Sequence, residues 1–455
     1  MRHVVIRSTV AAVLAASALR AQRPATLPRL VQLVDSAGNA LVREGKAPGL
    51  GVAIALRGRI VYAKGFGYAD IENRLAVTPA SVFQVGSVTK QFTSAAILQL
   101  VEAGKLALTD PLTKFYPDWP GAGSKVTVAH LLSHTSGIRN YTAIPIFQAW
   151  KSHFVPADSM LALFKSQTFD FEPGTKWNYS NSGYYILGQL VEKLSGESYA
   201  NYVRTHLAEP NGLTTLRYCD LTPLIPNRVR GYATRREGGY ENASYQEMST
   251  PYAAGALCAS ASDLVKWTVA LQSGKVVRAE TYRDMVTPRP LADGTPQSYA
   301  FGLGVGDLGG HRVVSHNGGI DGFRSQLASY PNDSLVIAVL LNGDTDLPDR
   351  FEKQVARWAL GVPTPVVKDL PVPAALLEQV AGSYVGAPGP VTITSKDGKL
   401  YVELGALQRL MYQGGATFMI DGNADFVLRF APEGARSETL TVTVPGATLA
   451  FKRTK

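Results

Sequence analysis

The stretch FQVGSVTK, residues 83–90, decides how the rest of this chain is interpreted. On a helix that begins near Ser87, the side chains of Ser87 and Lys90 lie on one face, about one turn apart. The apolar residues that follow favour such a helix, and Gly104 is placed to end it. A lysine in this position can hold or accept the serine proton if burial lowers its pKa. The spacing alone also fits a capping serine beside a surface lysine, so other segments must support it.

The composition is that of a folded globular protein. The chain has 455 residues, of which 45% are hydrophobic and 18% charged, enough for a large core in two or three domains. The formal net charge is +9 and falls to +6 without the three arginines of the first 21 residues. Because the sequence has no dense run of lysine and arginine, we expect no nucleic-acid partner. A polyanion-binding surface is a weaker alternative.

Residues 1–21 have the pattern of a secretory signal peptide. Arg2 and Arg7 precede a short core of apolar and small residues at 10–19, and the segment ends on Ala21. The core is too short to span a bilayer, and no other stretch reaches 18 uninterrupted apolar residues. We therefore expect a periplasmic or secreted protein with no integral membrane span after signal removal.

The rest of the chain divides into two parts of different character. Residues 28–361 alternate between helical and strand-like patterns, residues 362–373 form a proline-rich linker, and residues 374–455 are β-rich. The β-rich tail predicts a small separate domain, a barrel or a sandwich. It contains no catalytic constellation, and its simplest role is to pack against the first domain.

Strand-like runs lie near both ends of the first part, with a helical segment between them. This order predicts one antiparallel sheet that is completed from both chain ends, flanked by helices, and interrupted by a helical insertion. The predicted strands form a hairpin at 51–56 and 59–65 and a second group at 299–305, 312–316, 323–330 and 335–342.

The cysteines and histidines give no sign of a metal site. Cys219 and Cys258 are the two cysteines of the chain. In an exported protein they are candidates for one disulfide, with two buried thiols as the alternative. His130 and His134 are four residues apart but have no acidic partner nearby, so we expect a packed or hydrogen-bonded role. No cluster has metal-ligand spacing, and we expect neither a metal nor a cofactor.

Two further segments supply groups that a reactive serine needs. Tyr179 and Asn181 precede an apolar helix. A phenol beside an ammonium has a lowered pKa and can act as a general base, and the amide can fix the lysine or a substrate carbonyl. The sequence HNGG at 316–319 ends a predicted strand, where a free N–H can join that of Ser87 in receiving an oxyanion. Each segment alone fits an ordinary buried tyrosine or turn, but their order favours catalysis.

With these motifs in this order, the sequence resembles the serine β-lactamase/penicillin-binding protein superfamily, in the branch of class C β-lactamases, DD-peptidases and related esterases. The resemblance covers roughly residues 28–361 and rests on SVTK at 87–90, YSN at 179–181 and HNG at 316–318. It implies an α/β (α+β) fold, with an antiparallel sheet flanked by helices and an all-helical subdomain. The tail from residue 374 resembles the small lipocalin-like β-barrels that some members carry.

The resemblance also implies a role for each motif residue. Ser87 is the acylated nucleophile, and Lys90 and Tyr179 share the proton transfer. Asn181 orients the lysine and the substrate. The backbone N–H groups of Ser87 and Gly319 form the oxyanion hole.

One motif departs from the pattern of the superfamily. His316, followed by Asn317 and Gly318, stands where many members carry the lysine of KTG. That lysine is cationic and suits a substrate carboxylate, whereas a histidine is mostly neutral at pH 7. Asn317 also replaces the usual hydroxyl residue. The departure disfavours efficient β-lactam hydrolysis and favours esterase or D-amino-acid peptidase/amidase chemistry.

The sequence therefore predicts an exported serine hydrolase with a Ser87 acyl-enzyme. Its substrate is a small molecule or peptide with an ester or amide carbonyl, and β-lactam hydrolysis is a weak side activity at most. The alternative is a non-catalytic binding or sensor protein that captures cell-wall peptides or β-lactams in the same cleft. The oligomeric state does not follow from the sequence.

Overall fold

The computed structural model describes residues 23–454, apart from residues 236, 387–388, 405, 422 and 445–446. The predicted signal peptide at 1–21 lies outside the described residues. Within the described part of the chain, no helix has both the length and the apolar character that crossing a membrane requires.

The centre of the molecule is a seven-stranded antiparallel sheet to which both ends of the first part contribute. Its strand order is β3-β2-β1-β12-β11-β10-β9, and β1 pairs with β12 so that Val52 faces Val339. The predicted sheet is confirmed. Its strands are β1 (Gly49–Leu56), β2 (Arg59–Asp70), β3 (Leu75–Ala76), β9 (Gly304–Leu308), β10 (His311–Ile320), β11 (Phe323–Tyr330) and β12 (Leu335–Leu341).

Several strand boundaries differ from the prediction, and those of β9 and β10 bear on the site. β9 starts at Gly304 rather than at residue 299, and Tyr299 forms only an isolated bridge with Gly304. The ring of Tyr299 instead packs against His134, with ring centroids 4.7 Å apart. Aromatic residues favour strands through their packing, and here the packing partner lies outside the sheet. β10 continues past His316 to Ile320, so the HNGG segment lies inside the strand.

The two faces of the sheet are covered by different helices. Val52 and Ile54 of β1 belong to one apolar core with α1 (Leu27–Arg43) and α11 (Leu347–Leu360). Ala53 and Ala55 point the other way, into the core that contains α2 (Thr89–Glu102) and α9 (Ala261–Gln272). Because side chains alternate along a strand, the unbroken apolar run of β1 serves both cores.

The helical region carries the segments around Ser87. α2 packs against α7 (Asn181–Ser195). The other helices are α3 (Leu112–Phe115), α4 (Val128–Leu132), α5 (Phe147–Trp150), α6 (Ala157–Lys165), α8 (Tyr199–Tyr202) and α10 (Ala279–Met285). The short helical turns are η1 (Gly86–Val88), η2 (Gly121–Lys125), η3 (Tyr141–Ala143), η4 (Val203–Ala208), η5 (Glu209–Asn211), η6 (Tyr252–Ala254) and η7 (Pro331–Asp333).

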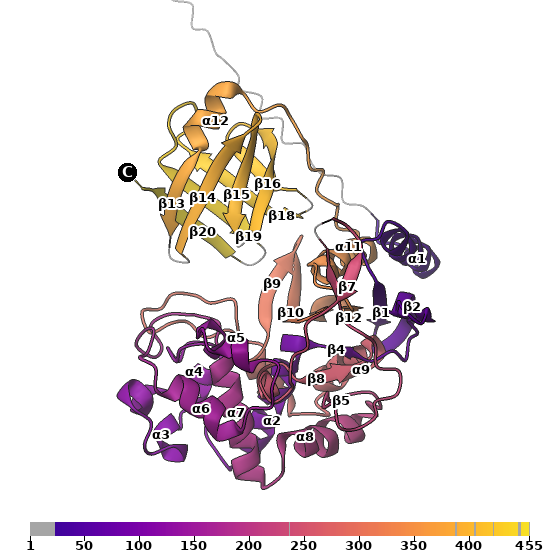
Figure 1. Cartoon of the computed structure of the whole chain (residues 1–455), viewed down its shortest axis with the longest axis vertical. Coiled ribbons are helices and arrows are strands. Elements are labelled where there is room, and N and C mark those ends of the chain that lie inside the picture. Colours follow the sequence, from indigo (N-terminus) through magenta and orange to yellow (C-terminus); the bar gives the residue numbers. More distant parts are fainter. Residues whose placement is uncertain are drawn as a thin grey trace, which may run out of the picture.

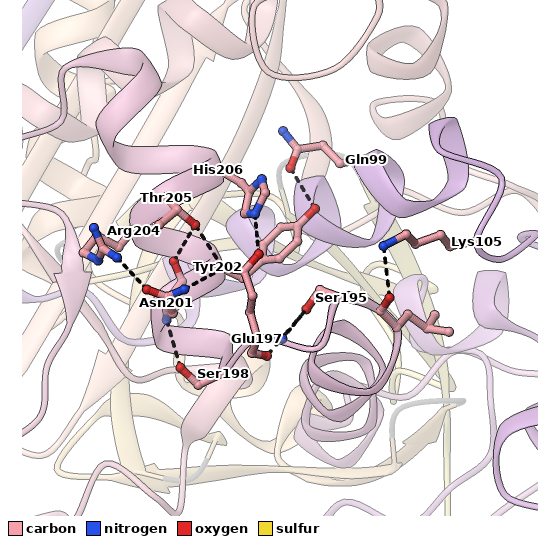
Figure 2. Close-up of polar contacts among 11 residues, drawn as sticks. Gln99, Lys105, Ser195, Glu197, Ser198, Asn201, Tyr202, Arg204, Thr205 and His206 are labelled. Atoms are coloured by element: carbon pink, nitrogen blue, oxygen red, sulfur yellow. Dashed lines mark hydrogen bonds and ion pairs between the residues drawn. The ribbon is translucent and has the colours of Figure 1, made fainter.

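Polar side chains join the C-terminal end of α2 to the corner after α7 (Figure 2). The Tyr202 hydroxyl donates to Oε1 of Gln99 at 3.1 Å. Nζ of Lys105, just beyond α2, donates to the Leu194 carbonyl at 3.1 Å. These bonds hold α2, the helix that follows Ser87, against α8 and the end of α7.

Three short strands bring the segment before the nucleophile together with the two cysteines, Cys258 in β8 (Leu257–Ala259) and Cys219 directly after β5 (Arg217–Tyr218). β4 (Phe83–Gln84), β8 and β5 form a small sheet, and β6 (Tyr232–Thr234) pairs with β7 (Tyr240–Asn242). Cys258 and Cys219 are buried free thiols, so the candidate disulfide is not formed in this structure. Cys258 donates a hydrogen bond to Cys219, and that bond, with Arg228 beside it, lowers the pKa of Cys219.

The tail forms a closed eight-stranded barrel after a short helix, which confirms the predicted small β-barrel. Its interior is filled by side chains, among them Phe418 and Phe430 with ring centroids 5.7 Å apart. Residues 361–373 contain no helix or strand. The elements are α12 (Ala374–Val380), β13 (Gly382–Gly386), β14 (Gly389–Lys396), β15 (Lys399–Leu404), β16 (Ala406–Gly414), β17 (Thr417–Ile420), β18 (Asn423–Ala431), β19 (Thr439–Val444) and β20 (Ala447–Arg453).

The barrel lies at one end of the molecule and the helical region at the other, with the seven-stranded sheet between them (Figure 1). A nearly buried ion pair connects the barrel to the sheet domain. Nη2 of Arg357 in α11 lies 2.5 Å from Oδ1 of Asp425 in β18. The same guanidinium donates through Nη1 to the Pro363 carbonyl at 2.9 Å.

Candidate active site

Ser87 lies in η1, between β4 and α2. The preceding Gly86 has a φ of +50°, a conformation that glycine adopts without strain. Ser87 is partly exposed and lines a cleft of about 380 Å³. The local turn therefore presents the hydroxyl to a space large enough for a small substrate.

Lys90, one turn further on, is fully buried beneath this serine, with 0% of its surface exposed. Its Nζ lies 3.1 Å from Ser87 Oγ, 2.8 Å from Asn181 Oδ1 and 2.8 Å from the Ala254 carbonyl oxygen. The Tyr179 ring centroid is 4.8 Å from the same nitrogen. Burial without a carboxylate partner lowers the pKa of Lys90 well below its ordinary value.

Tyr179 lies beside both residues, and its hydroxyl is hydrogen-bonded to Ser87. Burial raises the pKa of Tyr179 above its ordinary value, and the bond to Ser87 offsets only part of that rise. The prediction of a lowered pKa for this phenol was therefore wrong. It assumed a charged Lys90, whereas the lysine itself is buried and its pKa is lowered. The two shifts favour a protonated Tyr179 beside an uncharged Lys90.

His316 lies behind the cleft and does not line it. Its Nε2 is 2.9 Å from the Tyr299 hydroxyl, and its Nδ1 is 2.5 Å from the Asn317 carbonyl oxygen. Burial, together with the nearby Lys90, lowers the pKa of His316 to about 3. The imidazole is therefore neutral at pH 7 and supplies no positive charge at the position of the KTG lysine.

The glycines of the HNGG segment allow β10 to lie directly against the nucleophile turn. A Cβ at Gly318 would lie 2.0 Å from the Val85 carbonyl oxygen. A Cβ at Gly86 would lie 2.8 Å from the backbone nitrogen of Gly319. Pairing of β10 with β9 ends at Ser315, so that edge of the HNGG segment has no further strand partner among the described residues. The backbone nitrogen of Gly319 therefore lies next to the turn that carries Ser87.

The structure thus brings Ser87, Lys90, Tyr179 and Asn181 together, with Gly319 beside them. Asn181 is the first residue of α7, and its Oδ1 accepts from Lys90. Of the two uses considered for its amide, fixing the lysine is the one that this structure contains.

Two further residues, His134 and Asn140, contact the segment that carries Tyr179 and Asn181. His134 has a φ of +60° and its Nδ1 accepts from the backbone N–H of Ser180 at 3.2 Å. Its ring lies 4.3 Å from that of Tyr179, so the packed and hydrogen-bonded role expected for this histidine is the one observed. Asn140 Oδ1 accepts from the Asn181 backbone N–H at 3.1 Å. No local pattern marks Asn140, because its partner lies 41 residues away.

Charged residues line the cleft on the side of Gly319, and the sequence analysis assigned no role to them. They are Lys151, which follows α5, Asp321 in the turn between β10 and β11, and Arg324 in β11. Lys151 Nζ and Asp321 Oδ2 form an ion pair at 2.6 Å.

No group of three or more metal-ligating side chains occurs within the described part of the chain.

The comparisons with known proteins agree on the family. The β-lactamase family model matches residues 32–361, which is most of the chain. The chain therefore belongs to the β-lactamase family, whose members share a fold and include serine hydrolases acting on amide bonds.

Three relatives illustrate the range of this family. The chain is 30% identical to a D-aminopeptidase of Brucella ovis over 329 residues, which cover 71% of this chain and 62% of that protein. It thus spans less than two thirds of that relative. The structure of an octameric penicillin-binding protein homologue from Pyrococcus abyssi is similar with a TM-score of 0.67 at 26% identity, covering 93% of this chain and 100% of the other. A D-stereospecific amidohydrolase from Streptomyces sp. gives a TM-score of 0.61 at 27% identity, covering 69% and 94%.

Proposed function

We propose that this chain is a serine hydrolase that cleaves amide or ester bonds of D-amino-acid derivatives through an acyl-enzyme on Ser87. The observation that carries the proposal is the environment of Lys90, a buried amine whose nitrogen contacts the serine hydroxyl. Relatives named D-aminopeptidase and D-stereospecific amidohydrolase support the choice of substrate class.

The contacts of Lys90 can be made by an ammonium, which donates to all three oxygens, and also by a neutral amine. A neutral amine has two N–H groups and one lone pair. The Asn181 amide oxygen and the Ala254 carbonyl oxygen can only accept, so they take the two N–H groups. The lone pair is then left for the Ser87 hydroxyl. Lys90 is in this way prepared to take the proton when Ser87 Oγ attacks the substrate carbonyl carbon.

The other groups stabilise the charge that develops on the substrate and transfer the proton to the leaving group. The oxyanion that forms on the carbonyl oxygen is received by the N–H groups of Ser87 and Gly319. Tyr179, which stays protonated because its pKa is raised, donates its proton to the leaving group and regains one from Lys90. The C–N or C–O bond breaks and leaves the acyl group on Ser87. A water then attacks the ester, with the same pair accepting its proton.

β-Lactams are expected to be poor substrates. Their carboxylate is carried by the ring that contains the leaving nitrogen, and the residue that would face it, His316, is neutral with a pKa of about 3. Histidine at this position therefore disfavours β-lactam binding at neutral pH.

Labelling of Ser87 tests the proposal. The wild-type protein should react with a fluorophosphonate, and intact mass should show one adduct that maps to the peptide of Ser87. Ser87→Ala should abolish the adduct, whereas Ser166→Ala, at an exposed serine in the helical region, should keep it. Labelling of Ser87→Ala at the wild-type level would refute the assignment.

Turnover separates an enzyme from a binding protein. D-alanine p-nitroanilide should be hydrolysed, and more rapidly than its L-enantiomer. Binding of such compounds without product release would favour the non-catalytic sensor instead.

We also propose that the protein is exported, on the pattern of residues 1–21. Fractionation of cells that express the full chain should place it in the periplasm or the medium, shortened at its N-terminus. Retention of full-length protein in the cytoplasm would contradict this.

A further inference from the structure

The cleft beside Ser87 lies on the acyl side of the bond to be cleaved. The leaving group must receive its proton from Tyr179 and therefore points toward that residue. Neither Tyr179 nor His316 contributes to the walls of the cleft, whereas Asn181, Gly319 and Arg324 do. The part of the substrate that remains on Ser87 is thus the part that occupies the cleft.

One cation of this cleft has no carboxylate partner among the described residues. Lys151 is neutralised by Asp321 at 2.6 Å. Arg324 donates through Nη1 to the carbonyls of Ile320 at 3.1 Å and Phe323 at 2.9 Å, which fixes its guanidinium against the turn. Within the described residues, its Nε and Nη2 groups have no acceptor and remain available to a ligand.

The guanidinium of Arg324 lies close to where the acyl carbonyl would sit. Gly319 pairs with Arg324 across the β10–β11 ladder. A Cβ at Gly319 would lie 3.5 Å from Nε and from Cζ of Arg324. The N–H of Gly319 is the proposed oxyanion donor. A substrate carboxylate bound to Arg324 would therefore lie next to the carbonyl group that Ser87 attacks.

We propose that Arg324 forms a carboxylate-binding subsite for the acyl half of the substrate. The substrate class is then an amide or ester whose acyl group carries a carboxylate, such as a D-glutamyl or D-aspartyl derivative. A guanidinium fork binds a carboxylate through two parallel, charge-assisted hydrogen bonds. The inference rests on the proposed function. It implies that the positive charge that binds the substrate lies on the acyl side, at Arg324, and not on the leaving-group side, where His316 is neutral.

A matched pair of substrates tests this subsite. D-Glutamyl p-nitroanilide and D-glutaminyl p-nitroanilide have the same leaving group and nearly the same shape, and they differ in the charge of the acyl side chain. We expect wild-type kcat/KM to favour the glutamyl compound by about 10-fold or more, because a charge-assisted bond is lost with the amide. Arg324→Gln should reduce this ratio to about 1, and Arg324→Lys should leave an intermediate ratio.

A control variant and a parallel labelling measurement separate loss of the subsite from loss of the active enzyme. Arg204→Gln removes an exposed guanidinium in η4 that does not line the cleft. Arg204 is bonded to Asn201 (Figure 2) and to Glu209, and this variant should keep the wild-type ratio. Fluorophosphonate labelling of Ser87 is followed in parallel.

Each remaining outcome would overturn one specific claim. A wild-type ratio near 1, or a ratio that Arg324→Gln leaves unchanged, would overturn the subsite. If the protein is still labelled but turns over neither nitroanilide, the subsite is also overturned, and the serine hydrolase assignment stands. Loss of labelling in the wild-type protein would overturn the proposed function itself.

Discussion

The protonation state of Lys90 is the residue-level feature on which the chemistry depends. A lysine at an exposed position is charged and cannot accept a proton from serine at pH 7. Lys90 is buried, and its three contacts are with Ser87, Asn181 and the Ala254 carbonyl, none of which is a carboxylate. Desolvation therefore decides its charge in this site.

A depressed lysine pKa makes stability depend on pH. Between the lowered folded pKa of Lys90 and its unfolded value, the unfolded chain binds one proton more than the folded chain. The free energy of unfolding contributed by this group must then rise with pH, by about 1.4 kcal/mol per pH unit for a full proton, and level off above the unfolded pKa. Lys90→Met removes the ionisable group and should flatten this part of the curve.

Urea unfolding of the wild-type protein and of Lys90→Met between pH 6 and 10 measures the difference. If the two curves run parallel across this range, Lys90 binds its proton equally in both states and the neutral amine is excluded. Lys90→Met should also lose activity by about 1,000-fold, since the proton acceptor is gone.

The role of Tyr179 predicts a dependence on the leaving group. If its phenol protonates the departing nitrogen, Tyr179→Phe should lower kcat for D-alanine amide by about 100-fold or more. A p-nitrophenyl ester of D-alanine leaves as a stable anion and should lose much less. Steady-state kinetics on both substrates checks this, and equal losses would assign Tyr179 to serine activation alone.

At the scale of elements, the approach of β10 to the η1 turn sets the geometry of the oxyanion hole. Ser325 Oγ donates to the Val85 carbonyl at 2.8 Å across this junction. Gly318→Ala would place a Cβ 2.3 Å from the same Oγ and 2.0 Å from the carbonyl oxygen. The strand must then move away from Ser87.

We expect Gly318→Ala to lower kcat by about 100-fold, the effect of losing one oxyanion donor, with a smaller change in KM. Gly304→Ala is the matched control in β9, because a Cβ there meets its nearest neighbour, the Ser315 carbonyl oxygen, at an ordinary 3.5 Å. Wild-type kcat in Gly318→Ala would show that the junction adapts without cost.

Strands with a continuous apolar pattern could be predicted from the sequence. Strands whose ends depend on contacts outside the sheet could not. β12 and β1 are apolar along their whole length because both faces are covered, and the sequence pattern located them. β9 was displaced by several residues because Tyr299 packs against His134 rather than within the sheet. Cys219 and Cys258, the candidate disulfide pair, lie together as buried thiols with a hydrogen bond between them in this structure.

At the scale of the whole molecule, Arg357 joins the hydrolase domain to the barrel. The side chains of Arg357 and Asp425 are 9% and 21% exposed, so their pairing is worth more than that of a surface ion pair. Asp425→Ala leaves the guanidinium without a carboxylate and should weaken the contact by about 2 kcal/mol. The barrel should then move relative to the sheet domain, without loss of activity.

Small-angle scattering should therefore give a larger radius of gyration for Asp425→Ala than for the wild-type protein. Asp369→Ala removes a pair with Arg409 that lies between the linker and the barrel, and it should leave the radius unchanged. An unchanged radius in both variants would mean that other contacts fix the barrel.

The sequence by itself determined the chemical groups of this protein and the order in which the chain supplies them. Periodicity fixed the sheet, the helices beside it and the β-rich tail, because such patterns depend on near neighbours. Only the tertiary structure decided which groups carry charge. Lys90 meets Asn181 and Ala254 across 91 and 164 residues. The burial that results lowers the pKa of the lysine, raises the pKa of Tyr179 and keeps His316 neutral at pH 7. The tertiary structure also decided that, among the described residues, Arg324 in the cleft beside Ser87 has no carboxylate partner. Ion pairing depends on distances that no local sequence pattern encodes.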